Sequence, residues 1–233
     1  MPWLAESADK ADIKRKIHSG LLTLARGDGL SEFLCLLKRK FWWDYHAHWY
    51  VCNLSINLSS KTSPPIPNSF VVSHLSQETI SWMKALDIPG LANRLEIENI
   101  LAKKHLIYTL IVKDTIAGYL KIGKGAVYIP DFDQFMYVPK EEAFVMDTFI
   151  HNDFRGKKLF HFFCSEVKHD LHDKGFSKIH CHIRCDNLVS ASAYRKNGFQ
   201  QKGALLYKRR LWKRYLISPP NFFSDIKVSR NNC

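Results

Sequence analysis

The feature that most constrains the fold is the junction MDTFIHNDFRGKKLFHFF at residues 146–163, where an apolar segment meets a basic turn and then a helical pattern. Residues 143–150 predict a strand, and Gly175 marks the end of the helix that follows the turn. Such a turn gathers unpaired backbone N–H groups, the positive end of a helix dipole and cationic side chains. It therefore suits a phosphate or diphosphate, although a solvated surface is often built from the same residues.

Alternating or β-favouring segments predict the rest of a sheet. The expected strands are 48–58, 70–76, 106–112, 117–123, 143–150, 177–185 and 204–212. The strands 106–112 and 117–123 are expected to form a hairpin. Helices are expected at 9–25, 30–43, 76–86, 91–105, 159–173 and 188–197. Asp186 or Asn187 can cap the last helix, and Gly198 can end it. The sequence therefore predicts a mixed α+β fold.

The segment SSKTSPPIPNS at residues 59–69 is rich in residues that interrupt regular structure, and it marks a predicted domain boundary. Residues 1–67 are expected to form a basic N-terminal extension with two helices, one strand and this linker. Residues 68–233 are expected to form the main domain with a basic C-terminal tail.

The composition limits the partners without choosing one. The chain has 34 Lys and Arg against 22 Asp and Glu, which gives a net charge of +12. This charge favours a polyanion, a membrane surface or an anionic cofactor. The N-terminal residues lack a secretory pattern, so we expect a cytoplasmic protein. The six cysteines form no C-x-x-C pair, and we expect reduced thiols rather than disulfides.

Two segments together resemble the signatures of the GCN5-related N-acetyltransferase (GNAT) superfamily. The stronger match is NLVSASAYRKNGF, in which the matching residues are Asn187, Ser190, Tyr194, Lys196, Gly198 and Phe199. The weaker match is the junction, where NDFRGKKLF follows Ile150. The resemblance extends from Phe70 to about Tyr215. It implies a central, mostly antiparallel sheet flanked by helices, here with an N-terminal helical extension.

The resemblance also implies a co-substrate, acetyl-CoA or another acyl-CoA, and no metal. The residues that it assigns to cofactor binding are Phe149, Ile150, Arg155, Gly156, Lys157, Lys158 and Asn187. The chain departs from the family pattern where Lys158 replaces a glycine and Phe160 replaces a glycine or alanine. These side chains crowd the approach of a diphosphate, while Lys158 adds a positive charge.

Acyl transfer to an amine needs a proton acceptor for the amine and benefits from a proton donor to the thiolate. The resemblance assigns the donor role to Tyr194, whose alternative role is that of a core tyrosine. Asp147, on an otherwise apolar strand, is the candidate base or amine anchor, and a solvent-facing role remains the alternative. His151, Glu141 and Glu142 are further candidates for the base.

The segment HCHIRC at residues 180–185 could suggest a zinc site. On a strand, however, His180 and His182 face one way while Cys181 and Cys185 face the other, so we expect no metal site. The basic aromatic segment YKRRLWKRYL at residues 207–216 could bind nucleic acid. Alternation on a terminal strand explains it more simply, and we do not expect a nucleic-acid partner.

We therefore expect an enzyme, an N-acyltransferase that moves an acetyl group from acetyl-CoA to a primary amine by direct attack. The acceptor is expected to be a small molecule, and the protein a monomer or homodimer. One alternative is a degenerate binding module that uses its basic surface for nucleic acid or anionic lipid. Another is an acyltransferase for surface-polysaccharide or lipid precursors, whose N-terminal helices contact an anionic membrane.

Overall fold

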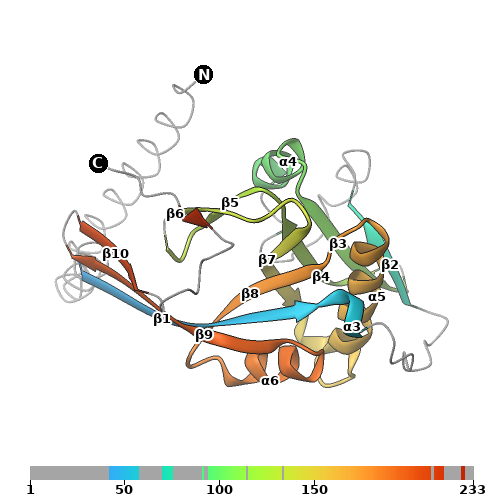
Figure 1. The fold of residues 1–233 in the computed structure, drawn as a ribbon. Coiled ribbons are helices and arrows are strands. Elements are labelled where there is room, and N and C mark those ends of the chain that lie inside the picture. Colours follow the sequence, from blue (N-terminus) through green and yellow to red (C-terminus); the bar gives the residue numbers. More distant parts are fainter. Residues whose placement is uncertain are drawn as a thin grey trace, which may run out of the picture. The chain divides into compact units, whose positions relative to one another are not determined.

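In the computed structural model, whose fold Figure 1 shows as a ribbon, the chain has two compact units, each described by itself. The smaller unit contains residues 1–45 and 206–217, and the larger unit contains residues 46–205 and 218–233. The residues that the structure describes are 42–57, 70–75, 91, 94–113, 115–132, 134–210, 213–217 and 227–228.

Several predictions fall outside the described residues. They are the helices at 9–25 and 76–86, nearly all of the helix at 30–43, and the membrane contact of the N-terminal helices. The last two residues expected in the helix 30–43 belong to a strand, which corrects that boundary. None of the described helices is long and apolar enough to cross a bilayer. The division at residue 67 stays a prediction.

The larger unit is built on a mixed sheet with the strand order β9-β1-β8-β7-β4-β3-β2. Neighbouring strands pair in antiparallel fashion at β1/β8, β2/β3, β3/β4 and β4/β7, whereas β7 and β8 are parallel. The strand bounds are β1 Trp42–Asn53, β2 Phe70–His74, β3 Leu106–Val112, β4 Thr115–Gly123, β7 Glu142–Ile150, β8 Lys178–Arg184 and β9 Gln200–Arg210. The predicted α+β class with a mostly antiparallel sheet is confirmed.

Strand β1 lies inside this sheet, between β9 and β8. Its pairing with β8 runs from Ala47 opposite Arg184 to Asn53 opposite Lys178. The prediction placed this strand at 48–58, but it ends at Asn53, and residues Leu54–Asn57 form the short helix α3. A segment predicted to belong to an extension therefore contributes hydrogen bonds to the interior of the sheet.

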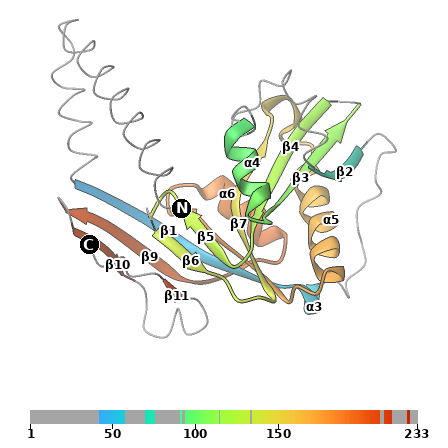
Figure 2. The same ribbon diagram turned by 90° about the horizontal axis from the view of Figure 1, so that it is seen from above.

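Helices cover both faces of the sheet (Figures 1 and 2). Helices α5 (Leu159–Asp173) and α6 (Leu188–Lys196) pack with one face in the main hydrophobic core. Helix α4 (Arg94–Ala102) packs on the opposite face in a smaller core. The two cores use alternate residues of the same strands: Leu120 belongs to the first and Tyr119 to the second. This alternation follows from the two-residue period of a strand.

Both predicted helix stops are confirmed. Gly175 and Gly198 follow α5 and α6 with φ angles of 85° and 84°, a conformation that glycine adopts without a steric cost. After α5, the N–H groups of Gly175 and Phe176 donate to His172 and Leu171, which is the Schellman pattern. The same pattern ends α6 at Gly198. These stops fix the starts of the strands that follow the two helices.

A second, three-stranded sheet follows β4 and was not predicted. Strands β5 (Ala126–Ile129) and β6 (Gln134–Tyr137) form an antiparallel hairpin, and β11 (Lys227–Val228) pairs with β6. The hairpin inserts between β4 and β7, two strands that themselves pair directly. Each of its two strands has only four residues, and aromatic side chains, Tyr128 and Tyr137, stand at exposed positions. The alternation of apolar and polar residues is therefore weak in the sequence.

In the smaller unit, the end of β9 pairs in antiparallel fashion with β10 (Lys213–Ile217). Arg210 of β9 donates two hydrogen bonds to the carboxylate of Asp44, the second at 2.9 Å. Such bidentate pairs are geometrically specific. The final strand was predicted at 204–212, whereas β9 begins at residue 200.

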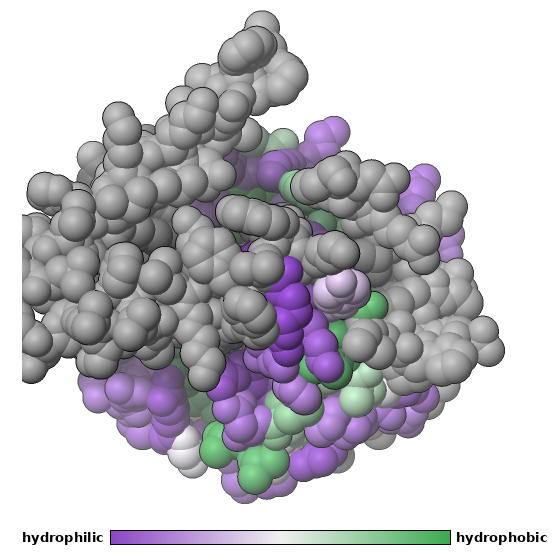
Figure 3. Space-filling view, turned by 90° about the vertical axis from the view of Figure 1, so that its left-hand side faces the viewer, coloured by the Kyte–Doolittle hydropathy of each residue, from purple (hydrophilic) through white to green (hydrophobic). Residues whose placement is uncertain are grey.

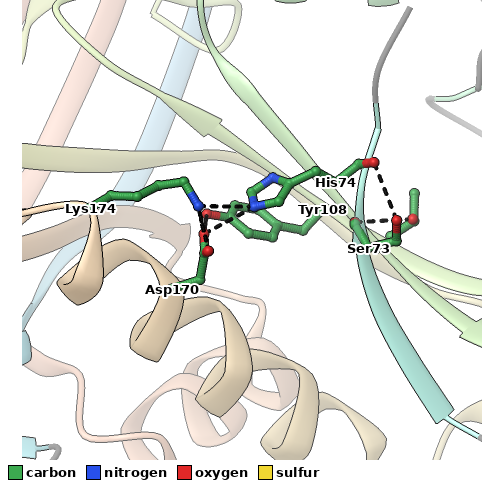
Figure 4. A network of polar contacts seen from close by, with 6 residues as sticks. Ser73, His74, Tyr108, Asp170 and Lys174 are labelled. Atoms are coloured by element: carbon green, nitrogen blue, oxygen red, sulfur yellow. Dashed lines mark hydrogen bonds and ion pairs between the residues drawn. The ribbon is translucent and has the colours of Figure 1, made fainter. Parts of the chain in front are cut away.

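A polar network joins β2 and β3 to the C-terminal half of α5 (Figure 4). The Tyr108 hydroxyl donates to Asp170 at 2.5 Å, and His74 Nε2 lies 3.1 Å from the same carboxylate oxygen. Lys174 also binds Asp170, one helical turn away. Burial alone would raise the pKa of Asp170, but the hydrogen bonds from Lys174 and Tyr108 lower it. This network holds an edge of the sheet against the helix that begins at the basic turn.

Among the described residues of the larger unit, the large hydrophobic side chains that are exposed are those of Val71, Leu95, Tyr128, Tyr137, Leu188 and Val189. On the face drawn in Figure 3, green hydrophobic patches lie between purple hydrophilic residues. Single exposed apolar residues are common on protein surfaces and by themselves indicate no binding site.

Candidate active site

A β-bulge in β7 determines which way the candidate site residues point. Opposite β4, Asp147 pairs with Lys121 and Val145 pairs with Ile122, so Met146 is an extra residue. A bulge of this kind reverses the alternation of side chains along the strand. As a result, Val145 and Thr148 share the face covered by α5 and α6, whereas Asp147 points to the opposite face.

The pairing of strands β7 and β8 ends just before the bulge, and the strands diverge from there. Their parallel pairing runs from Glu142 opposite Lys178 to Phe144 opposite His180, although both strands continue past these residues. Helix α6 follows β8, and its residue Tyr194 reaches across to β7. The Tyr194 hydroxyl lies 2.7 Å from Oγ1 of Thr148. Parallel strands that diverge in this way can admit a ligand between them.

The ring of Tyr194 is enclosed by hydrophobic residues. The Phe160 ring centroid lies 5.1 Å away, and Phe199 makes an edge contact at 4.9 Å. Only 4% of Tyr194 is exposed. Burial raises the pKa of Tyr194 well above its ordinary value, while the hydrogen bond with Thr148 acts in the opposite direction. The ring of Tyr194 therefore packs in the core, and its hydroxyl reaches the point where the two strands diverge. Its role as a proton donor stays a prediction.

The predicted basic turn connects β7 to α5. Asn152–Phe154 form one 3₁₀ turn (η2), Gly156 has a φ angle of 76°, and α5 begins at Leu159. The first N–H groups of a helix have no acceptor within the helix. Here the first helical bonds run from His161 and Phe162 to the carbonyl of Lys158. The turn therefore presents N–H donors and the positive end of the α5 dipole, as predicted from the sequence.

Lys158 has a φ angle of 58°, in the left-handed region where glycine is favoured. This is the position at which the family pattern has glycine and this chain has lysine. The backbone thus retains the glycine-type conformation, with the strain that a Cβ adds.

The other cations of the turn are partly engaged with neighbouring groups. Arg155 Nε donates to the carbonyl of Ile150 at 2.9 Å, and its guanidinium lies 5.8 Å from the Phe149 ring centroid. Lys157 Nζ lies 5.5 Å from the ring centroid of Phe154. Of the predicted cofactor residues, the structure therefore brings Phe149, Ile150 and Arg155 into contact with one another.

Asn187 is the N-cap of α6, one of the two capping residues considered from the sequence. Its side-chain oxygen accepts a hydrogen bond from the Ser190 N–H at 3.1 Å. Capping residues of this type satisfy a backbone donor at the helix start. Its contact with a cofactor stays a prediction.

Asp147 belongs to a polar cluster on the face covered by α4. The Tyr119 hydroxyl donates to its carboxylate at 2.6 Å, and Lys121 Nζ lies 3.7 Å from the same oxygen. Lys121 also donates to Glu96 of α4 at 2.7 Å. The Lys121 side chain is 3% exposed, whereas those of Asp147 and Glu96 are 45% and 48% exposed. Two solvent-accessible carboxylates are therefore held by one buried ammonium group.

Burial raises the pKa of Tyr119 well above its ordinary value, and the hydrogen bond to Asp147 raises it further. This hydroxyl therefore remains a donor to the carboxylate at neutral pH. Sequence reasoning missed Tyr119, Lys121, Glu96 and Thr148. The sequence held a signal for Tyr119 and Lys121. They lie two residues apart in the apolar strand AGYLKIG, so their side chains must lie on the same face of the sheet.

The alternative candidates for the base lie elsewhere. Glu142 is at the start of β7, where it is buried and bound by Lys178 at 2.8 Å and His180 at 2.6 Å. Glu141 precedes it on the surface. His151 follows the end of β7, and its Nδ1 accepts a hydrogen bond from the Asp153 N–H. Asp147 is therefore the predicted carboxylate that lies beside the bulge.

The histidines of β8 bind carboxylates. Trp49 Nε1 donates to His180 Nδ1 at 3.2 Å, so the opposite ring nitrogen carries the hydrogen that is given to Glu142. His182 Nε2 lies 2.8 Å from Asp131. Cys181 packs in the core on the opposite face, as expected. Among the described residues, no group of three or more potential ligands could hold a metal ion.

Comparisons with solved structures agree with this architecture. A Drosophila protein matches with a TM-score of 0.50 at 11% identity, over 73% of this chain and 52% of that chain. An acetyltransferase from the GNAT family of Colwellia psychrerythraea matches with a TM-score of 0.50 at 10% identity, over 71% of this chain and 56% of that chain. This chain thus spans about half the length of each. At these identities the likeness concerns the fold alone.

A comparison with curated protein sequences gives no significant match. The family model described as the acetyltransferase (GNAT) family matches residues 73–199, which is more than half of the chain. The match includes the bulged strand, the basic turn and α6. The chain therefore belongs to the acetyltransferase (GNAT) family.

Proposed function

We propose that this protein is an N-acetyltransferase that moves the acetyl group of acetyl-CoA to a primary amine of a small molecule. The observation that carries the proposal is the position of the Tyr194 hydroxyl, which bonds Thr148 where β7 and β8 diverge. The basic turn follows the same strand β7. A turn suited to an anion and a candidate proton donor are thereby associated with one strand end, an arrangement that favours acyl transfer from CoA.

The turn suits the diphosphate of CoA. Backbone N–H groups at the start of α5, the helix dipole and the charges of Arg155, Lys157 and Lys158 all favour an anion. Gly156 leaves open space where a side chain would stand, since a Cβ added there meets no atom within 4 Å. The left-handed conformation of Lys158 preserves the backbone course despite its side chain. These features support retained binding, and the acyl group is proposed to be acetyl.

The proposed reaction is a direct attack. The neutral amine nitrogen forms a bond to the thioester carbon as the carbon–sulfur bond breaks. Asp147 accepts the amine proton, directly or through water, or anchors the amine, and its carboxylate is oriented by Tyr119. Tyr194 gives its proton to the departing sulfur. The chain's own residues thus supply an acceptor on one face of β7 and a donor on the other.

A combined binding and turnover experiment tests the proposal. Heat denaturation is followed with CoA, acetyl-CoA and longer acyl-CoAs, and thiol release is measured with amino sugars, polyamines, amino acids and peptides as acceptors. A ligand that binds the native state raises the melting temperature. A raised melting temperature together with amine-dependent thiol release supports the enzyme. Binding without release supports the degenerate binding module, and absence of both contradicts the assignment of the turn.

A further inference from the structure

The Thr148 hydroxyl owes its position to the bulge in β7. Met146 is the extra residue opposite β4, and it turns Thr148 toward α6. In a regular strand, Thr148 would face the side opposite to Val145, because side chains alternate. The contact with Tyr194 therefore depends on a specific irregularity of the backbone, in the strand that also holds Asp147.

The need for Tyr194 to act as an acid decides which of the two hydroxyl groups donates the hydrogen bond between them. Either oxygen can act as the donor in the contact of 2.7 Å. A phenol that protonates a leaving thiolate must direct its own hydrogen at the sulfur, so its oxygen is left to accept. The threonine hydroxyl has one hydrogen to give. Thr148 can therefore donate its hydroxyl hydrogen to the Tyr194 oxygen during the reaction.

The electrostatic effect of this bond favours proton release. Burial raises the pKa of Tyr194, which by itself would make the residue a poor acid. The hydrogen bond with Thr148 lowers that pKa. A donor aimed at an oxygen that becomes negative stabilises the charge as it develops. The benefit of the threonine hydroxyl is therefore expected in the transition state.

We propose that Thr148 is a positioning residue that donates to the Tyr194 oxygen, directs the phenolic hydrogen at the thioester sulfur and stabilises the phenolate. The inference rests on the proposed function. As the carbon–sulfur bond breaks, sulfur keeps the bonding pair and receives the Tyr194 proton, while the phenolic oxygen keeps the O–H pair. Solvent then returns a proton to Tyr194, which balances the proton lost by the amine.

The test compares Thr148→Val, Thr148→Ser, Tyr194→Phe and the double variant Thr148→Val/Tyr194→Phe. Thiol release from acetyl-CoA is measured with the fastest amine of the panel named above, or with water if no amine is faster. Thr148→Val is expected to lower kcat about 10-fold to 100-fold, the range for a hydrogen bond to a charged group. KM for acetyl-CoA should change little. Thr148→Ser retains the hydroxyl and should recover most of the turnover.

The double variant separates positioning from packing. Once Tyr194 lacks its hydroxyl, Thr148→Val should cause no further loss, because the partner of the interaction is gone. The matched control is Thr109→Val, the same change at a buried β3 threonine whose hydroxyl donates to the Ser73 carbonyl at 3.3 Å. Its kcat should equal that of the wild type.

Two results would overturn the inference: wild-type turnover in Thr148→Val, or an equal loss from Thr148→Val in both backgrounds. Wild-type turnover in Tyr194→Phe would instead remove the proton-donor assignment of the proposed function, on which the inference depends. Melting temperatures of all variants establish that each protein is folded.

Discussion

Tyr194 of α6 and Thr148 of β7 are joined by a hydrogen bond of 2.7 Å between their hydroxyl oxygens, beyond the last pair of β7 with β8. The bond places a buried phenol beside the strand that carries Asp147. Asp147 and Thr148 are consecutive and face opposite sides of the sheet, so β7 carries one proposed catalytic group and contacts the other.

Replacement of Tyr194 by phenylalanine tests the proton donor. The ring contacts with Phe160 and Phe199 are retained, so the fold should survive. Loss of general-acid assistance should lower kcat by about 10² to 10⁴. CoA affinity should change little, because the hydroxyl acts mainly as charge develops. Steady-state kinetics and CoA titration measure both quantities, and unchanged turnover would leave Tyr194 only its packing role.

Asp147→Asn tests the carboxylate. The amide oxygen can still accept from Tyr119, but the side chain no longer accepts a proton, so kcat should fall by about 10² to 10⁴. A rise in KM for the amine at unchanged kcat would instead identify Asp147 as an amine anchor. Asp173→Asn, at an exposed aspartate near the end of α5, is the control and should behave as the wild type.

Arg155→Glu tests the diphosphate site through the melting temperature. The reversed charge at the turn should abolish most of the increase caused by CoA, because a carboxylate repels the diphosphate. Lys140→Glu makes the same change in net charge at an exposed residue before β7 and should retain the increase. If Arg155→Glu retains it as well, CoA must bind elsewhere.

Gly118→Ala tests the packing at the end of β7. A Cβ on Gly118 would stand 2.5 Å from Ile150 Cδ1 and 2.6 Å from the Phe149 carbonyl oxygen. The free energy of unfolding should fall by about 1 to 3 kcal/mol, as for other overpacked sites. Adding Ile150→Val removes the methyl contact and should restore part of the loss in urea denaturation. If Gly118→Ala has the stability of the wild type, β4 and β7 can move apart at this pair without lowering the free energy of unfolding.

The pair of Glu142 and His180 predicts a pH-dependent contribution to stability. Burial alone would raise the pKa of Glu142, but hydrogen bonds from Lys178 and His180 lower it below the ordinary value of 4.5. Because the pKa is lower in the folded chain than in the unfolded chain, the stabilisation is present above about pH 4.5 and is lost as the pH falls through the folded-state value.

Glu142→Gln should therefore be less stable than the wild type at pH 7, by about 1 to 3 kcal/mol, with the difference shrinking as the pH falls below 4.5. Urea denaturation at several pH values measures the difference. Glu141→Gln, at the exposed neighbouring residue, should show no such trend. A difference that stays constant with pH would show that the ionised carboxylate is not what stabilises the fold.

Local patterns in the sequence were sufficient for many elements. Gly175 and Gly198 predicted both helix ends, and the structure shows the positive φ angles that make glycine suitable there. Asn187 was one of the two residues considered for the cap of α6, and the hairpin of β3 and β4 was predicted. These features depend on residues close in the chain, so short-range propensities decide them. The short hairpin β5–β6 was missed because its pattern is brief.

Long-range pairing decided the rest. The sequence did not place β1 between β8 and β9, because strand order depends on contacts between distant segments. The segment VMDTFI at residues 145–150, taken as a regular strand, puts Val145 and Asp147 on one face, whereas the bulge at Met146 places them on opposite faces.

The sequence by itself determined the α+β class and the basic turn, and it singled out Tyr194 and Asp147 as candidates for the proton donor and the base. Only the tertiary structure decided that Tyr194 meets Thr148 and that Asp147 meets Tyr119 and Lys121, because one extra residue in a β-ladder changes which face each later side chain occupies.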